Sequence, residues 1–155
     1  MEKGEKFPDF KLVDDQGNEF SSKQMKGKRY IIYFYSKDNT SGCTREAQAF
    51  SESIEKFKAL DIPVIGVSKD SVESHQKFIE SKNLKIKLLS DPDHVLMEKV
   101  GAWGTKMMYG KETTGTIRST FIVGENGKVE AVWKRVKVDG HVDKVYDQAC
   151  SLSNC

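Results

Sequence analysis

Cys43 is the residue whose type and position most favour chemistry in this sequence. It follows the polar stretch 36–42, and apolar residues then recur in steps of three and four, as they do on one face of a helix. We therefore expect Cys43 in the first turn of that helix. Unpaired N–H groups and the positive end of the helix dipole stabilise a thiolate there, and the thiolate is the reactive form of cysteine.

Thr40 precedes Cys43 by three residues, so its hydroxyl could cap the helix or turn toward the sulfur. Ser41 and Gly42 are small and permit close approach of a ligand. A simpler interpretation stays open for each residue, because a lone cysteine is often a small buried hydrophobe and a threonine at such a place is often a plain cap.

The other two cysteines, Cys150 and Cys155, stand near the C-terminus. An odd number of cysteines with this spacing does not resemble the disulfide framework of a secreted protein, so we expect a cytoplasmic, reducing environment. A metal site is a weak alternative, because the sequence has no Cys-x-x-Cys pair. The three histidines also stand apart, at His75, His94 and His141.

The elements that must position Cys43 alternate between strand and helix. Residues 30–35 are aromatic and β-branched, which predicts a central strand buried on both faces. Residues 63–67 predict a second buried strand, and residues 71–82 an amphipathic helix after it. The helix that follows Cys43 presents an apolar face of Ala47, Phe50, Ile54, Phe57 and Leu60.

Two pairs of segments predict antiparallel hairpins, which makes the sheet mixed. Residues 120–123 and 129–136 flank an Asn-Gly turn signal, and residues 10–13 and 19–20 bracket a polar turn near the N-terminus.

The remaining segments are the C-terminal end and residues 101–116. A last helix begins near Gly140, and Cys150 lies beside its apolar face; a short tail follows and ends at Cys155. Residues 101–116 are rich in Gly, Thr and Met, and we expect an ordered loop there.

Length and composition predict one globular α/β domain over residues 1–155, since 155 residues with 37% hydrophobic side chains suffice for one core. With 25 basic and 23 acidic residues, no single-sign field selects nucleic acid or an anionic membrane. The N-terminus is charged, and no apolar run approaches the roughly 20 residues that span a bilayer, so we expect a soluble protein that is not exported.

Residues 33–47, YFYSKDNTSGCTREA, resemble the active-site segment of the peroxiredoxins, in particular the bacterioferritin comigratory protein or Q-type subfamily of the AhpC/TSA superfamily. Residues 88–92, 103–104, 108–111 and 117–122 resemble later motifs of that subfamily in order and spacing. The resemblance implies a thioredoxin-like fold.

The resemblance also implies an activity, the reduction of hydrogen peroxide and organic hydroperoxides in protection against oxidative stress. Cys43 would be the peroxidatic nucleophile, Thr40 the hydroxyl that orients thiolate and peroxide, and Arg118 the cation that stabilises the thiolate and the transition state. Backbone N–H groups of Gly42 and Cys43 would add donors. The implied protein needs no metal or organic cofactor, takes electrons from a thioredoxin-like protein or a small thiol, and is a monomer.

The sequence departs from the family pattern at two positions. Ser36 stands where the family has proline, which predicts a freer loop and a slower or more easily over-oxidised enzyme. Gln48 stands where many relatives have a resolving cysteine. Cys150 and Cys155 are then the protein thiols left to resolve a sulfenic acid at Cys43, and every pairing among the three cysteines stays open, as does resolution by an external thiol.

Two other functions remain alternatives. A redox-sensing or holdase protein of the same fold would use Cys43 as a sensor thiol. A cysteine hydrolase would need one of the histidines as a base in contact with Cys43. Trp103 and Tyr109 could line a peroxide pocket, but aromatic residues of this size are more often core or surface-patch residues.

Overall fold

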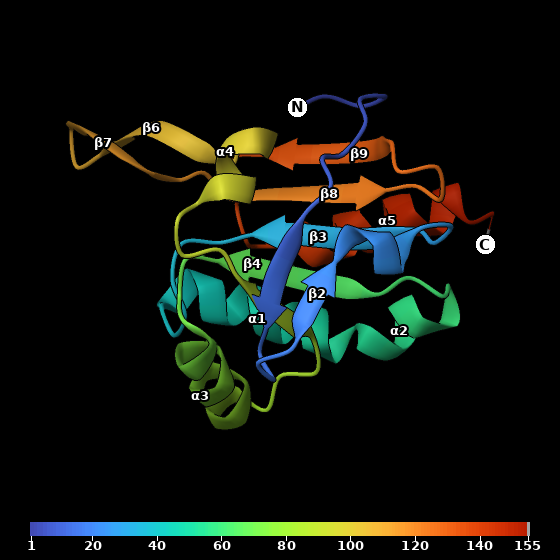
Figure 1. Cartoon of the computed structure of the whole chain (residues 1–155), viewed down its shortest axis with the longest axis horizontal. Coiled ribbons are helices and arrows are strands. Elements are labelled where there is room, and N and C mark those ends of the chain that lie inside the picture. Colours follow the sequence, from blue (N-terminus) through green and yellow to red (C-terminus); the bar gives the residue numbers. More distant parts are fainter. Residues whose placement is uncertain (155) are drawn as a thin grey trace.

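The computed structural model describes residues 1–154, and within them a mixed seven-stranded sheet has the order β2-β1-β5-β4-β3-β8-β9 (Figure 1). The neighbours of β3 are β4, which is parallel to it, and β8, which is antiparallel. These strands span β1 (Lys11–Asp14), β2 (Glu19–Ser21), β3 (Tyr30–Phe34), β4 (Val64–Ser68), β5 (Lys87–Ser90), β8 (Ser119–Val123) and β9 (Val129–Lys134).

Helices cover this sheet. They form where apolar residues recur every three or four positions rather than every two. They are the short 3₁₀ helix η1 (Ser22–Met25) and the α-helices α1 (Ser41–Glu52), α2 (Ile54–Ala59), α3 (Val72–Lys82), α4 (Val95–Val100) and α5 (His141–Leu152). The predicted mixed α/β class, the central strand at 30–35, the helix at 71–82 and both hairpins are confirmed.

The side chains of β3 divide the core into two layers. Ile31 and Tyr33 point to the face covered by α1, α2, α3 and α5, and Ile32 and Phe34 point to the face covered by α4 and the N-terminal segment. All five residues of β3 are at most 4% exposed. The continuous apolar run is therefore explained by a strand with a hydrophobic layer on each side.

Two predictions about elements are wrong. Residues 101–116 form no loop but two antiparallel strands, β6 (Trp103–Met108) and β7 (Lys111–Thr116), which project from the body (Figure 1). Threonines favour extended backbone, and Tyr109 and Gly110, both with positive φ, make the reversal. The helix after Cys43 is not continuous to Leu60 but is interrupted at Ser53 between α1 and α2.

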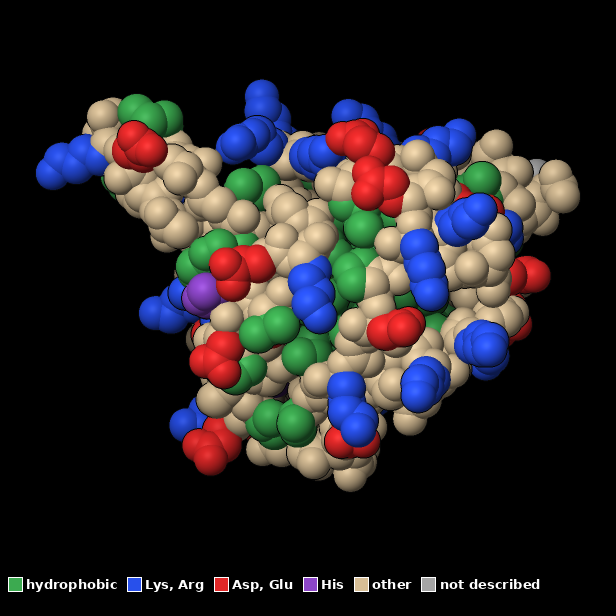
Figure 2. Space-filling model, turned by 45° about the horizontal axis from the view of Figure 1, so that its top comes forward, with side chains coloured by type: hydrophobic (Ala, Val, Ile, Leu, Met, Phe, Trp, Pro, Cys, Tyr) green, Lys and Arg blue, Asp and Glu red, His purple; other side chains and the backbone are tan. Residues whose placement is uncertain are grey.

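Basic and acidic side chains are interspersed over the face seen in Figure 2. In residues 1–154, no helix has the length and apolar character needed to cross a membrane.

Candidate active site

Cys43 is placed by the connection from β3 to α1. Residues 35–40 carry the chain from the buried end of β3 into α1, and Cys43 is the third residue of that helix, as the sequence predicts. Arg118 directly precedes β8, whose Ser119 pairs with Phe34 at the same end of β3. The antiparallel pairing of β3 and β8 thus brings together two residues that are 75 positions apart.

The Arg118 guanidinium bridges the cysteine and a carboxylate. Its Nη2 donates to Cys43 Sγ at 3.1 Å, and its Nη1 donates to Glu46 Oε1 at 2.6 Å. Cys43 is a free cysteine and is 2% exposed. A fixed guanidinium at this distance is a charge-assisted donor to a thiolate.

Glu46 is the most deeply buried charged group of the site, with 0% of the side chain exposed. Burial raises the pKa of Glu46 from 4.5 to about 7, against the opposing effect of the Arg118 cation. Its second oxygen, Oε2, is buried and has no hydrogen-bond partner within residues 1–154. Burial alone would lower the pKa of Arg118, but the neighbouring Glu46 and Cys43 raise it, so the guanidinium stays charged.

Thr40 occupies the N-cap position of α1, but its side chain makes no cap hydrogen bond. Of the two roles that the sequence leaves open for this hydroxyl, the helix cap is therefore wrong. The Thr40 hydroxyl instead donates to the Lys37 carbonyl at 2.9 Å, while the Thr40 carbonyl accepts the first bond of the helix from the Thr44 N–H at 2.8 Å. The hydroxyl proton is committed to the loop, which leaves the hydroxyl oxygen free to accept a hydrogen bond.

The histidines have their partners away from the sulfur. His75 bonds Asp38 and the Leu89 carbonyl, and His94 bonds Glu98. His141 shares a 2.8 Å hydrogen bond with Thr120, and burial lowers the pKa of His141 to about 4. Among the described residues, none of these histidine contacts is to Cys43, so the base that a cysteine hydrolase needs is not in place.

The remaining candidates lie elsewhere. Tyr109 is 98% exposed at the turn of the β6–β7 hairpin, and Trp103 stacks on His94 with ring centroids 3.9 Å apart. Tyr109 is thus a surface residue, whereas Trp103 is half-buried and packs against the core layer that includes α4. Cys150 is half-buried in the last turn of α5, and Cys155 lies outside the described residues. Within residues 1–154, no group of three or more His, Cys, Asp or Glu side chains is placed to hold a metal ion.

Sequence reasoning missed Glu46, although a signal for it existed. Glu46 follows Cys43 by three residues, so the two side chains share one face of α1. A buried acidic residue of this kind calls for a polar or cationic partner, and the structure shows that the partner is Arg118.

Comparisons with known proteins agree with this geometry. Residues 3–132 match the model of the AhpC/TSA family. The chain is 45% identical over 142 residues to "Peroxiredoxin Bcp" of Bacillus subtilis, covering 92% of this chain and 90% of the relative.

Two solved structures show the same architecture. One comes from a study of the alkyl peroxide reduction activity of the Xanthomonas campestris bacterioferritin comigratory protein; it has a TM-score of 0.88, 34% identity and coverage of 93% of this chain and 92% of that one. The other is a PrxQ mutant of Xylella fastidiosa, with a TM-score of 0.93, 29% identity and coverage of 99% and 98%. The fold is therefore thioredoxin-like, and the chain belongs to the AhpC/TSA family, within it to the Bcp and Q-type peroxiredoxins.

Proposed function

We propose that this protein is a thiol peroxidase in which Cys43 reduces hydrogen peroxide and organic hydroperoxides. The observation that carries the proposal is the 3.1 Å contact of the Arg118 guanidinium with Cys43 Sγ at the start of α1. The thiolate attacks one peroxide oxygen and the O–O bond breaks. Cys43 becomes a sulfenic acid, and the departing oxygen takes a proton to give water or an alcohol.

Three groups assist this step. Arg118 stabilises the thiolate and the negative charge on the departing oxygen. The Thr40 hydroxyl donates its hydrogen bond to the Lys37 backbone carbonyl, so its oxygen can accept a hydrogen bond from the peroxide O–H. The N–H groups of Gly42 and Cys43, in the first turn of α1, donate to the same pocket.

Regeneration of Cys43 uses a thiol from outside the chain, either a thioredoxin-like protein or a small thiol. The first thiol displaces water from the sulfenic acid to form a mixed disulfide, and a second thiolate releases Cys43. The placement of Cys150 supports this route. His141 contacts Thr120 beside the site, and Cys150 follows nine residues later on α5, about 14 Å along the helix axis. We therefore expect Cys43 and Cys150 to be too far apart to form a disulfide unless the backbone moves.

The test is peroxide consumption with a dithiol reductant in excess. We expect many turnovers in the wild type and none in Cys43→Ser, with Cys150→Ser and Cys155→Ser as matched single-thiol controls that keep the wild-type rate. Oxidation of Cys43 only once per chain would support a sensor or holdase instead. Turnover retained in Cys43→Ser would overturn the proposal.

We also propose a cytoplasmic monomer. A reducing compartment maintains the Cys43 thiol between cycles. Four large hydrophobic residues are exposed. Met107 and Tyr109 lie in the projecting hairpin, whereas Val13 and Val95 come from two other segments of the chain. Sedimentation equilibrium should give the mass of one chain, 17.5 kDa, and a doubled mass would contradict it.

A further inference from the structure

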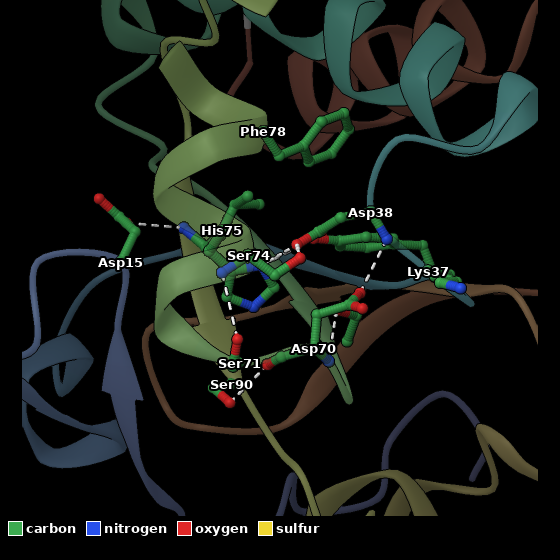
Figure 3. A network of polar contacts seen from close by, with 12 residues as sticks. Asp15, Lys37, Asp38, Asp70, Ser71, Ser74, His75, Phe78 and Ser90 are labelled. Carbon is green, nitrogen blue, oxygen red and sulfur yellow. Dashed lines mark hydrogen bonds and ion pairs between the residues drawn. The ribbon is translucent and has the colours of Figure 1, made fainter. Parts of the chain in front are cut away.

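The loop that leads into α1 is anchored by a buried carboxylate, Asp38, which is 7% exposed. Its Oδ1 accepts from Tyr35 Oη at 2.5 Å, and its Oδ2 accepts from Ser74 Oγ at 2.8 Å. His75 Nδ1 lies 2.8 Å from the same Oδ2. Figure 3 shows the side chains of Asp38, Ser74 and His75 converging at this point.

His75 has partners for both ring nitrogens. Its Nε2 lies 2.9 Å from the Leu89 carbonyl oxygen, which can only accept, so Nε2 carries a hydrogen. Its Nδ1 faces Asp38 Oδ2. His75 is 0% exposed. A fully satisfied hydrogen-bond network of this kind is rigid.

A second contact fixes the backbone of the same residue. The Asp38 N–H donates to Asp70 Oδ2 at 2.7 Å, and Ser68 Oγ donates to the same oxygen at 2.7 Å (Figure 3). Asp38 is thus tied through its side chain to α3 and through its backbone to the residues that follow β4.

Asp38 lies within the turn that is closed by the hydrogen bond from the Thr40 hydroxyl to the Lys37 carbonyl. Lys37, which precedes Asp38, supplies the carbonyl that accepts the Thr40 hydroxyl proton. Asn39, which follows, has a φ of 65°, a left-handed conformation that asparagine adopts more readily than most residues. Holding Asp38 therefore holds the Lys37 carbonyl on one side and the Thr40 hydroxyl on the other.

Ser36 gives this loop no restraint of its own, because it lacks the ring that would limit φ. We propose that Asp38, held by His75, Tyr35 and Ser74, is a positioning residue that sets the Thr40 hydroxyl for peroxide and supplies the restraint that Ser36 lacks. This inference rests on the proposed peroxidase function. Asp38 acts through Thr40 and does not touch the sulfur, so it affects the reaction with peroxide rather than the thiolate itself.

Two reactions of Cys43 separate an effect on peroxide orientation from an effect on the thiolate. Stopped-flow fluorescence measures oxidation by hydrogen peroxide, and mass spectrometry of the Cys43 peptide measures alkylation by iodoacetamide, which needs the thiolate but no oriented hydroxyl. In Asp38→Ala we expect oxidation to slow about 10-fold or more, a loss typical of a misplaced reacting group, while alkylation changes by less than about threefold.

Milder variants keep the test valid should Asp38→Ala fail to fold. Asp38→Asn retains an acceptor oxygen and should recover part of the oxidation rate, and Ser74→Ala should lower the rate of oxidation a few-fold without changing alkylation.

Ser36→Pro should raise the oxidation rate more in the Asp38→Ala background than in the wild type, because it restores the missing restraint. Glu130→Gln, which disrupts the distant pair between Arg29 and Glu130, is the matched control and should leave both reactions unchanged.

Two results would overturn the proposal: folded Asp38 variants that oxidise at the wild-type rate, or variants in which oxidation and alkylation slow equally. Failure of the peroxidase function itself is recognised separately, since the wild type would then form no sulfenic acid at Cys43.

Discussion

At the scale of single residues, Arg118 is, after Cys43, the group on which we expect the proposed reaction to depend most, since among residues 1–154 it bonds to both Cys43 and Glu46. We expect Arg118→Ala to lower the rate of peroxide oxidation about 100-fold, the usual cost of removing one preorganised donor to developing negative charge. Arg118→Lys should recover little, because an ammonium cannot address both partners with a planar fork. Stopped-flow oxidation measures this, and an Arg118→Lys rate near that of the wild type would show that charge alone suffices.

Glu46 makes stability depend on pH. Its pKa is raised from 4.5 to about 7 in the folded protein, so between these values the folded state binds more protons than the unfolded state. The free energy of unfolding therefore falls as pH rises through this window, by about 3 kcal/mol from this group, and the contribution present below pH 4.5 is lost above pH 7.

Glu46→Gln removes this dependence while the amide oxygen still accepts from Arg118. Urea unfolding of both proteins across the window should show the variant gaining stability relative to the wild type as pH rises. Parallel stability curves would mean that Glu46 has no raised pKa.

At the scale of elements, Gly66 allows β4 to pack under Tyr33. A Cβ at this position would lie 2.8 Å from Leu88 Cδ2 and 2.9 Å from Tyr33 Cζ, and the Tyr33 ring stacks on Phe50 of α1 at 4.7 Å. We expect Gly66→Ala to destabilise the protein by about 1–3 kcal/mol through overpacking, measured by urea unfolding.

Gly115→Ala is the matched control in β7. Its added Cβ would meet only the flexible Lys106 side chain, at 3.5 Å, so we expect a change within about 0.5 kcal/mol. Equal effects of the two substitutions would contradict a packing origin.

At the scale of the whole molecule, both core layers pack on one sheet, and we propose that residues 1–155 form a single domain that unfolds as one unit. Trp103 packs against the layer under α4, and Trp133 packs against the layer under α1 and α5. In Trp103→Phe and Trp133→Phe, the remaining tryptophan reports on one layer. In each variant, we expect urea unfolding followed by tryptophan fluorescence to have the same midpoint as unfolding followed by far-ultraviolet circular dichroism. Layers that unfold at separate midpoints would divide the chain into two units.

The sequence by itself determined the alternation of strands and helices and the place of Cys43 in the first turn of α1, because these follow from hydrophobic periodicity and turn residues over short distances. It missed the hairpin at 103–116, where the pattern is weak and the strands pair only with each other. Arg118 entered as a site residue through resemblance to a family rather than through its own spacing.

Only the tertiary structure decided which charges meet. The pairing of β3 with β8 carries Arg118 to Cys43 and Glu46, and the packing of α3 on the sheet carries His75 to Asp38. Both contacts join segments that are distant in the chain, and each offsets the cost of burying a charged group, which depends on the tertiary fold. Cys43 is thus readable from sequence, whereas the carboxylates that shape its surroundings are defined by the fold.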